Sequence, residues 1–457
     1  MDVPAHIFRE YDIRGVVGVD LRPEFVTALG RALGSELRDQ GIKAVGVGRD
    51  VRPSGVHLSE CLREGLRAAG CDVVDYGQAP TPGIYHAVAT GDEGAGVAIT
   101  GSHNPPEYNG FKIALKTGAF YGQQIQALCR RMEHDDFRSG EGKESSRLIL
   151  PAYIEELAAR AHLSRKPRFA YDPGNGAAAL VCRELFAAMG LTPVALFDQP
   201  DGSFPNHHPD PTVEANMADL RRAVAEHGLE FGVAYDGDAD RIGVVDERGE
   251  ILWGDRLLIL YARDLLSRRP GASIIFDVKC SDTLHDAIAR AGGDPVMWKT
   301  GHSLVKTKMK ETGALLAGEM SGHMFFGEDW YGFDDAILAT VQLLSIVSAS
   351  DLPLSEHLAD VPKMASTPEI RIDCPDALKF KIVDAVREHF RANHEIIDID
   401  GVRVRFESGW ALLRASNTQP ALVMRAEALD TEALTDYVRR IETAVAAARN
   451  DLAEGER

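Results

Sequence analysis

The stretch that decides the fold is "AVGVGRDVRPSG", residues 44–55, in which a short apolar run passes into a polar loop. Such a run, rich in small and β-branched residues, predicts a buried strand, and the loop after it can begin a helix. The same pattern recurs as "RFAYDPGNGAAA" (168–179) and as "SIIFDVKCSDTL" (273–284). This recurrence predicts three similar units along the chain.

Two further apolar stretches, separated by helical patterns, complete each unit. The second strands are "CDVVDYG" (71–77), "LTPVALF" (191–197) and "GDPVMWK" (293–299). The third strands run into polar loops and are "GVAITGSHNP" (96–105), "FGVAYDGDADRIGVV" (231–245) and "ALLAGEMSGHMFF" (314–326). The order strand, helix, strand, helix, strand indicates parallel or mixed sheets with helices on both faces. Ligands of such sheets bind beyond the carboxyl ends of the strands, where these loops lie.

The last quarter of the chain has a different pattern. Strands are predicted at 369–374, 402–407, 410–417 and 421–428, with helices at 377–390 and 431–449. Four strands and two helices in this order indicate a small antiparallel α+β domain. The predicted domains are therefore residues 1–148, 149–252, 253–365 and 366–457.

Composition narrows the class of protein. Of 457 residues, 45% are hydrophobic and 26% are charged, which is typical of globular proteins and unlike disordered, collagen-like or membrane chains. The net charge of −19 argues against a nucleic-acid or anionic-membrane surface, so local basic residues must bind any anionic substrate. Six scattered cysteines, a charged N-terminus and the lack of a long apolar run predict a cytoplasmic protein with reduced thiols.

The segment "DGDADR" (236–241) places Asp236, Asp238 and Asp240 at alternate positions after a strand. Three neighbouring carboxylates repel one another unless a cation lies among them, and oxygen ligands suit Mg²⁺ or Ca²⁺. An EF-hand is rejected because Arg241 occupies the position that requires glycine. A second interpretation makes Asp236 the nucleophile of a phosphatase. Asp240, where such enzymes have Thr or Val, weakens that interpretation without excluding it.

The segment "TGSHNP" (100–105) ends a strand with Ser102 beside His103. These residue types also form ordinary turns. A phosphorylated Ser102, however, is a usable phosphoryl donor when a divalent cation and nearby cationic side chains such as Arg241 neutralise the transition state. Lys112, on the next strand, is a candidate acid, base or charge neutraliser. His103 is an alternative phosphoryl carrier.

Two further loops carry binding chemistry. "LAGEMSGH" (316–323) offers Glu319 and Ser321, whose oxygens suit neighbouring sugar hydroxyls, together with His323, which can transfer a proton. "RASNTQP" (414–420) has a guanidinium, two hydroxyls and an amide on one loop, which is the chemistry of a phosphate site. A polar hairpin with no ligand is the alternative for this second loop.

Four motifs in this order, "TGSHNP", "DGDADR", "GEMSGH" and "RASNT", resemble the α-D-phosphohexomutase superfamily and its bacterial phosphomannomutase/phosphoglucomutase branch. The resemblance covers essentially the whole chain and includes "YDIRG" (11–15), "DVKCS" (277–281) and "WKTGHS" (298–303). It implies four domains around a central cleft, of which the first three share one topology.

The resemblance also implies roles for individual residues. Ser102 is expected to be the phosphoserine and, with Asp236, Asp238 and Asp240, to bind Mg²⁺ beside Arg241. The reacting end of the substrate is expected to be lined by Tyr11, Arg14, Lys112, Lys279, His302 and His323. Glu319 and Ser321 are expected to bind the sugar, and the non-reacting phosphate is expected at Arg414, Ser416, Asn417 and Thr418. Ala239 stands where the family more often has glycine, a change expected to leave the metal ligands unaffected.

The activity implied is interconversion of hexose 1- and 6-phosphates through a hexose 1,6-bisphosphate. Mannose and glucose phosphates are expected rather than glucosamine phosphates, because the loop around Glu319 would contact O3 and O4, where mannose and glucose agree. The expected partner is the phosphosugar, with no nucleic acid or membrane, and the chain is expected to be a monomer or weak dimer. The alternatives are the Mg²⁺-dependent phosphatase and a non-catalytic acidic sugar-phosphate binder.

Overall fold

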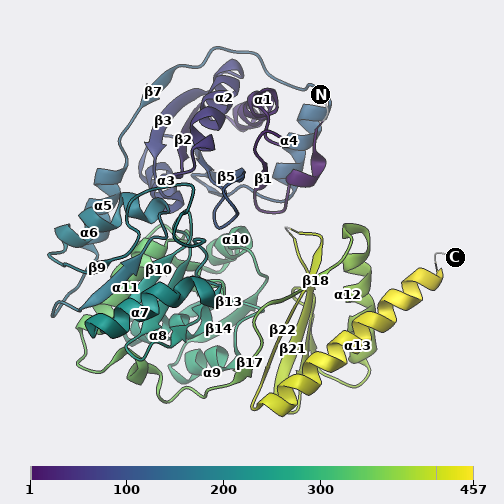
Figure 1. The fold of residues 1–457 in the computed structure, drawn as a ribbon. Helices are drawn as coiled ribbons and strands as arrows, with labels where there is room; N and C mark the ends of the chain where they lie inside the picture. The colour runs from purple at the N-terminus through teal and green to yellow at the C-terminus, as the bar shows by residue number, and fades with distance from the viewer. Residues whose placement is uncertain (1–2, 418, 456–457) are drawn as a thin grey trace.

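The computed structural model, which describes residues 3–417 and 419–455, contains four β-sheets that follow one another along the chain. The first three sheets mix parallel and antiparallel strand pairs, and the fourth is antiparallel throughout the described residues. Helices cover the first three sheets, whereas the fourth, in yellow-green, stands beside the long α13 (Figure 1). The predicted class of three mixed α/β domains and a C-terminal antiparallel α+β domain is confirmed.

The first domain begins with a short 3-10 helix, η1 (Ala5–Ile7). Its strands are β1 (Ile13–Val16), β2 (Ala44–Arg49), β3 (Asp72–Gln78), β4 (Ala95–Ile99), β5 (Tyr108–Leu115), β6 (Gly118–Ala119) and β7 (Glu144–Ser146). Its helices are α1 (Pro23–Asp39), α2 (Ser54–Ala68), α3 (Thr81–Thr90) and α4 (Gln123–Glu133). One face of α2 is buried in the core of this domain, because the apolar residues Leu58, Cys61, Leu62 and Leu66 recur at helical spacing.

The second domain is formed by α5 (Leu150–Ala159), β8 (Phe169–Asp172), η2 (Ala177–Leu180), α6 (Cys182–Ala188), β9 (Val194–Ala195), η3 (Glu214–Met217), α7 (Ala218–His227), β10 (Phe231–Tyr235), β11 (Ile242–Asp246) and β12 (Ile251–Leu252). The third is formed by α8 (Gly254–Arg268), β13 (Ser273–Asp277), α9 (Asp282–Arg290), β14 (Asp294–Trp298), α10 (His302–Thr312), β15 (Leu316–Gly318), β16 (Met324–Phe326), α11 (Ala336–Ser348) and η4 (Leu354–Leu358). Strand β9 is shorter than the predicted stretch, since Pro193 just before it has no N–H to donate.

The three sheets repeat one topology. In each, the first strand of the predicted unit (β2, β8 or β13) lies between the second (β3, β9 or β14) and the third (β4, β10 or β15). An antiparallel strand, β5, β11 or β16, then follows the third strand and pairs with it. The predicted internal repeat is therefore present, and the polar loops 100–107, 236–241 and 319–323 occupy equivalent hairpin positions.

The fourth domain contains β17 (Ala365–Ser366), β18 (Ile370–Asp373), α12 (Asp376–Arg391), β19 (Ile396–Ile397), β20 (Val402–Phe406), β21 (Gly409–Ala415), β22 (Ala421–Ala428) and α13 (Thr431–Gly455). The prediction of four strands was incomplete, because the sheet also includes β17 and β19. Each has only two residues, too few to show an alternating pattern in the sequence. Both helices pack on the sheet through one shared apolar core.

Contacts between domains bring the loops together. The backbone N–H of Thr81, at the start of α3, donates to the carbonyl of Asp238 at 3.0 Å, and Ile242 N donates to Gly322 O at 3.1 Å. The fourth domain contacts the third through Arg403, whose Nη1 donates to the backbone carbonyls of Val278 at 2.6 Å and Cys280 at 2.9 Å. Among the helices of the described ranges, none combines the length and the apolar content that a membrane crossing requires.

Candidate active site

Ser102 occupies the hairpin loop between β4 and β5 in a strained conformation. Its φ of 47° lies in the left-handed region, and the residue is 1% exposed. Such strain in a residue other than glycine costs about 1–3 kcal/mol and concentrates at functional sites. The Ser102 Oγ donates to Asp236 Oδ2 at 2.7 Å and lies 3.1 Å from His103 Nδ1. The serine of the first domain therefore faces the aspartates of the second.

A single buried guanidinium holds this loop. Arg52, which is 1% exposed, donates to the carbonyl oxygens of Ser102 at 2.9 Å and Asn104 at 2.5 Å. It also donates to the carbonyls of Pro105 at 2.6 Å and Tyr108 at 2.9 Å. Its charge is balanced by Asp50, whose Oδ2 lies 3.2 Å from Nε. Arg52, in the polar loop that follows β2, therefore holds the loop that carries Ser102 in place.

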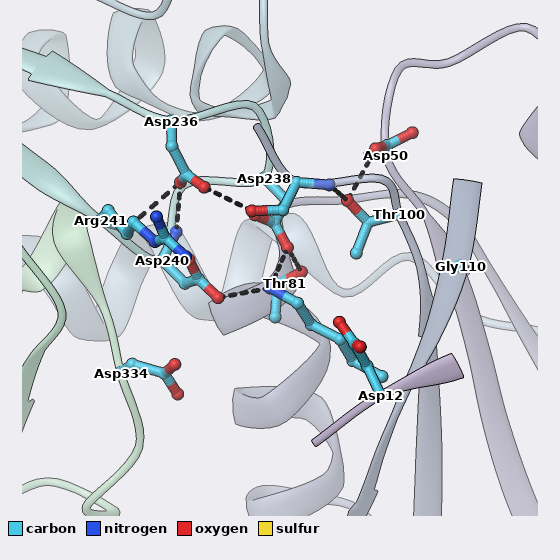
Figure 2. A network of polar contacts seen from close by, with 12 residues as sticks. Asp12, Asp50, Thr81, Thr100, Gly110, Asp236, Asp238, Asp240, Arg241 and Asp334 are labelled. Carbon is cyan, nitrogen blue, oxygen red and sulfur yellow. Dashed lines mark hydrogen bonds and ion pairs between the residues drawn. The ribbon is translucent and has the colours of Figure 1, made fainter. Parts of the chain in front are cut away.

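Asp236, Asp238 and Asp240 meet in the loop between β10 and β11, and all three are fully buried. Figure 2 shows their carboxylates close together, with Arg241 and Thr81 beside them. Burial and the neighbouring carboxylates of Asp238 and Asp240 raise the pKa of Asp236 well above its usual range. Three acidic groups in this space need a positive charge among them.

Lys112 supplies part of that charge. Its Nζ, on β5, donates to Asp238 Oδ2 at 2.7 Å and to Asp240 Oδ2 at 2.5 Å. Although burial opposes its ionisation, these carboxylates raise the pKa of Lys112 well above its usual value. Burial likewise opposes ionisation of Asp238, but Lys112 and the Thr81 hydroxyl, 2.5 Å away, lower its pKa. Lys112 is therefore a bound cation that neutralises the aspartates.

The residues present fit a divalent cation. One oxygen from each of the three aspartates lies within 4.8 Å of the others. Oδ1 of Asp238 and Oδ1 of Asp240 are buried and, within the described part of the chain, accept no hydrogen bond. An all-oxygen donor set with uncompensated buried oxygens is the chemistry that Mg²⁺ prefers. The serine loop closes on it at Gly237, where an added Cβ would lie 2.2 Å from the Ser102 carbonyl oxygen.

Arg241 and His323 join the second and third domains beside the aspartates. Arg241 Nε donates to His323 Nε2 at 3.0 Å, so His323 must carry its proton on Nδ1. That Nδ1 lies 3.1 Å from Asp334 Oδ2, and the His302 ring stacks on His323 with centroids 5.6 Å apart. The buried Asp334 thus orients the imidazole of His323.

Glu319 lies in the loop between β15 and β16 with Ser321. The Ser321 hydroxyl donates to Glu319 Oε2 at 3.2 Å, and Gly301 N donates to Oε1 at 2.6 Å. Burial raises the pKa of Glu319. Lys279 is placed by Glu369, at 3.3 Å, which links the third domain to the fourth.

The fourth-domain loop reaches the first domain through Tyr11. Asn417 Nδ2 donates to the Tyr11 hydroxyl at 2.7 Å, and that hydroxyl donates to Thr300 O at 2.7 Å. Arg414 Nε donates to Asp400 Oδ2 at 3.0 Å. Ser416 Oγ accepts from Gln419 N at 3.1 Å. Thr418 lies outside the described residues.

Two chains of contact therefore connect the predicted site residues. One runs from Arg14, whose Nη1 donates to Asn104 Oδ1 at 2.8 Å, through Ser102 to the aspartates and Arg241. The other runs through His302, whose ring lies 5.8 Å from that of Tyr11, to the fourth domain. No direct bond between Ser102 and the fourth-domain loop is seen among the described residues.

Comparison with known proteins identifies the family. Residues 5–139, 151–249 and 253–364 match "Phosphoglucomutase/phosphomannomutase, alpha/beta/alpha domain" I, II and III, and residues 369–444 match the C-terminal domain of the same family. The chain belongs to the phosphoglucomutase/phosphomannomutase family. It is an enzyme of this family, as the resemblance of its four motifs implied.

Relatives of this family align along nearly the whole chain. Phosphomannomutase/phosphoglucomutase of Pseudomonas putida is 48% identical over 96% of this chain and 95% of its own. The crystal structure of a phosphoglucomutase/phosphomannomutase family protein from Burkholderia thailandensis has a TM-score of 0.92 at 44% identity and 98% coverage of both chains. Aspergillus fumigatus N-acetylphosphoglucosamine mutase, solved with GlcNAc-6P and magnesium, shares the fold at a TM-score of 0.62 and 15% identity, covering 98% of this chain and 97% of its own.

The sequence patterns did not predict several residues that contact the candidate active site. Asp50 and Arg52 stand in the quoted strand-loop pattern, but nothing in the pattern shows that they hold a loop fifty residues later. Thr81 follows a Pro in "APTPG", which reads as a helix start, and Asp334 lies in "GFDD", which reads as a polar turn. Only their spatial neighbours reveal what these side chains do.

Proposed function

We propose that this enzyme interconverts the 1- and 6-phosphates of mannose, glucose or both, through a phosphoserine at Ser102 and a hexose 1,6-bisphosphate. The observation that carries the proposal is the hydrogen bond from the strained, buried Ser102 to Asp236 of the carboxylate cluster. A serine needs neither strain nor three aspartates to serve as an ordinary turn residue. The family and its relatives support the same activity.

In the proposed reaction, the phosphoryl group moves from Ser102 Oγ to O6 of a hexose 1-phosphate. The P–Oγ bond breaks as a P–O6 bond forms, the proton of the O6 hydroxyl passes to a base, and Oγ is left to regain a proton. The bisphosphate then turns end for end. Ser102 Oγ, losing its proton, attacks the phosphorus on O1, the P–O1 bond breaks, and O1 takes up a proton to give hexose 6-phosphate.

The chain's own residues supply charge and position for this transfer. A divalent cation held by Ser102, Asp236, Asp238 and Asp240 would polarise the phosphoryl oxygens and neutralise their charge. Arg241 and Lys112 add fixed positive charge beside Asp236 and Asp240. His323, whose Nδ1 lies 3.1 Å from Asp334 Oδ2, accepts a hydrogen bond from Arg241 at Nε2, beside the reacting end. Arg14 lies against the serine loop and is placed to bind phosphoryl oxygens there.

The other end of the substrate is assigned to the third and fourth domains. Glu319 and Ser321 would bind neighbouring sugar hydroxyls, with Lys279 and His302 beside them. The non-reacting phosphate would bind Arg414 and the loop 416–418, next to Tyr11. We propose that these residues line one cleft among the four domains, so that either phosphate of the bisphosphate can occupy either end.

The first experiment tests the phosphoserine. Purified enzyme should carry an acid-stable phosphate, detected by intact mass before and after phosphatase treatment, and Ser102→Ala should remove both this adduct and turnover. Ser203→Ala, at an exposed position, is the matched control and should change neither. Turnover is measured with glucose 1-phosphate and mannose 1-phosphate, each with a trace of bisphosphate. An acid-labile adduct would move the assignment to His103.

The second experiment tests the metal. Enzyme stripped with a chelator should lose turnover and recover it with Mg²⁺, while Asp238→Asn should lower kcat much more than it changes hexose phosphate binding. Loss of sugar affinity with turnover intact would instead favour a binding protein.

The phosphatase alternative is not favoured by the geometry of Asp236. Its Oδ1 accepts hydrogen bonds from the backbone N–H groups of Asp240 and Arg241, and its Oδ2 accepts from Ser102. Both oxygens are held by these donors, an arrangement that suits a fixed metal ligand better than a nucleophile. Release of inorganic phosphate by Ser102→Ala at the wild-type rate would support the phosphatase nevertheless.

A further inference from the structure

A cavity of about 390 Å³ lies between the first and third domains, apart from the catalytic loops. From the first domain it is lined by α3 and by residues 113–119 of the β5–β6 hairpin, and from the third by α10, residue 327 and residues 330–333. No residue of the loops 100–107, 236–241 or 319–323 lines it. Its volume falls within the range of small-molecule sites, roughly 300–1,000 Å³.

The cavity is positively charged in an acidic protein. Lys116, Lys306 and Lys310 line it, and no Asp or Glu does, although the chain carries a net charge of −19. Lys116 and Lys310 donate to the backbone carbonyls of Gly91 and Thr117. Across the described residues, neither of these two lysines pairs with a carboxylate. Their charges are thus available to an anion.

A comparison with another cavity shows that this charge is unusual. A second cavity, of about 410 Å³, is also lined by cationic side chains, including Arg268 and Arg269. There the arginines pair with Asp264 and Glu328, which line the same cavity. The charges of that cavity cancel. In the first cavity, here called the lysine-lined cavity, Lys306 is paired with Asp334, but Lys116 and Lys310 have no carboxylate partner among the described residues.

The walls of the lysine-lined cavity are aromatic. Tyr85 packs edge-on against Phe333 with ring centroids 5.7 Å apart, and Tyr331 stacks on Phe333 at 6.0 Å. Tyr331 is 44% exposed, whereas Trp330 is only 8% exposed. The buried Trp330 Nε1 has no hydrogen-bond acceptor within the part of the chain that the structure describes. Aromatic faces with a free N–H donor suit a flat ring that carries polar atoms.

We propose that this cavity binds a small amphipathic anion, with a flat apolar ring against the aromatic wall and a carboxylate, sulfonate or phosphate beside Lys116 and Lys310. The flat ring is inferred from the aromatic side chains of the lining, and the anionic group from its lysines. A hexose phosphate fits poorly, because it has no apolar ring to cover Tyr331 and Phe333. The site is therefore distinct in chemistry from the one that binds the phosphosugar.

The test uses 8-anilinonaphthalene-1-sulfonate, a flat aromatic ring system with one sulfonate, and measures its fluorescence on titration with the full-length enzyme. Wild type should show one saturable site, and Lys116→Glu/Lys310→Glu should weaken its dissociation constant at least tenfold. Lys166→Glu/Lys381→Glu is the matched control, since it makes the same charge change at exposed positions elsewhere. Lys306 is left unchanged because it pairs with Asp334, at 2.9 Å.

Two further results test the same site. Tyr331→Ala should also weaken binding, and excess glucose 1-phosphate should not displace the probe. Unchanged affinity in Lys116→Glu/Lys310→Glu, or an equal loss in the control, would overturn the proposal. Displacement by glucose 1-phosphate would place the probe in the catalytic site and overturn it as well. The fluorescence measurement needs no turnover, so its result is independent of the proposed mutase activity.

Discussion

Replacing Arg52 with methionine tests whether one buried guanidinium holds the loop that carries Ser102. Methionine keeps an unbranched apolar stem like that of arginine, although it is shorter, and it donates no hydrogen bond. The four backbone carbonyls of the loop, at residues 102, 104, 105 and 108, then lose their donor. Asp50 also loses the cation that balances its buried charge.

Two effects contribute, and they can be separated. Removing one partner of a buried ion pair costs about 3–5 kcal/mol of stability, because the remaining charge stays buried without compensation. The displaced serine loop affects turnover instead, since a shift of about 1 Å in a reacting group can cost about a hundredfold in rate. Arg52→Met should therefore lose both stability and kcat. Asp50→Asn/Arg52→Met should regain much of the stability, because no buried charge remains, but not the kcat.

The assay follows conversion of glucose 1-phosphate to glucose 6-phosphate, alongside thermal unfolding of each variant at one pH. Arg183→Met, which removes an exposed guanidinium from its ion pair with Asp198, is the control and should leave both stability and kcat almost unchanged. Wild-type kcat in Arg52→Met would refute the reasoning. Recovery of kcat in the double variant, together with stability, would show that Asp50 and not the loop was responsible.

Four other predictions concern Arg414, Asp334, Asp335 and the cysteines. Arg414→Ala should lower kcat/KM at least about tenfold for glucose 1-phosphate and mannose 1-phosphate alike, mainly by raising KM. The reason is that a bidentate contact with the phosphate would contribute about 1.5–3 kcal/mol of binding. Steady-state kinetics with both sugars measures this. Asp334→Asn should lower kcat about 10- to 100-fold with little change in KM, because the buried Asp334 carboxylate lies 3.1 Å from Nδ1 of His323 and positions that ring. A rise in KM with unchanged kcat would contradict this prediction. Burial raises the pKa of Asp335 to about 7, so the folded state holds a proton that the unfolded state has lost, and stability should fall as pH rises from about 4 to 7 and then level off. Thermal unfolding at pH 5 and pH 8 should show a smaller difference for Asp335→Asn than for wild type. All six cysteines are buried, and burial raises the pKa of the Cys182 thiol to about 12. A disulfide reagent at pH 8 should therefore label none of them rapidly in the native enzyme and all six after unfolding.

Local pattern was enough to predict the architecture. A strand of four to six residues followed by a polar loop, as at residues 44–55, is a short-range signal, and three copies of it predicted three similar sheets. The hairpin positions of "TGSHNP" and "DGDADR" followed from the same signal, because polar loops in mixed sheets gather where the strands end. Strands β17 and β19 were missed since two residues carry no alternation.

Sequence patterns alone were enough to select the candidate side chains: a serine beside a histidine, three alternating aspartates, and a loop with arginine and hydroxyls. Which of them lie in contact depends on how the domains pack. Ser102 and Asp236 are 134 positions apart, and Lys112 and Asp240 are 128 apart, yet both pairs are within hydrogen-bond distance. Arg52, Thr81 and Asp334 had no signal at all, because their roles depend on buried polar groups that distant segments deliver. Buried polar groups need hydrogen-bond partners. No local sequence pattern indicates which partners the packing of separate domains will supply.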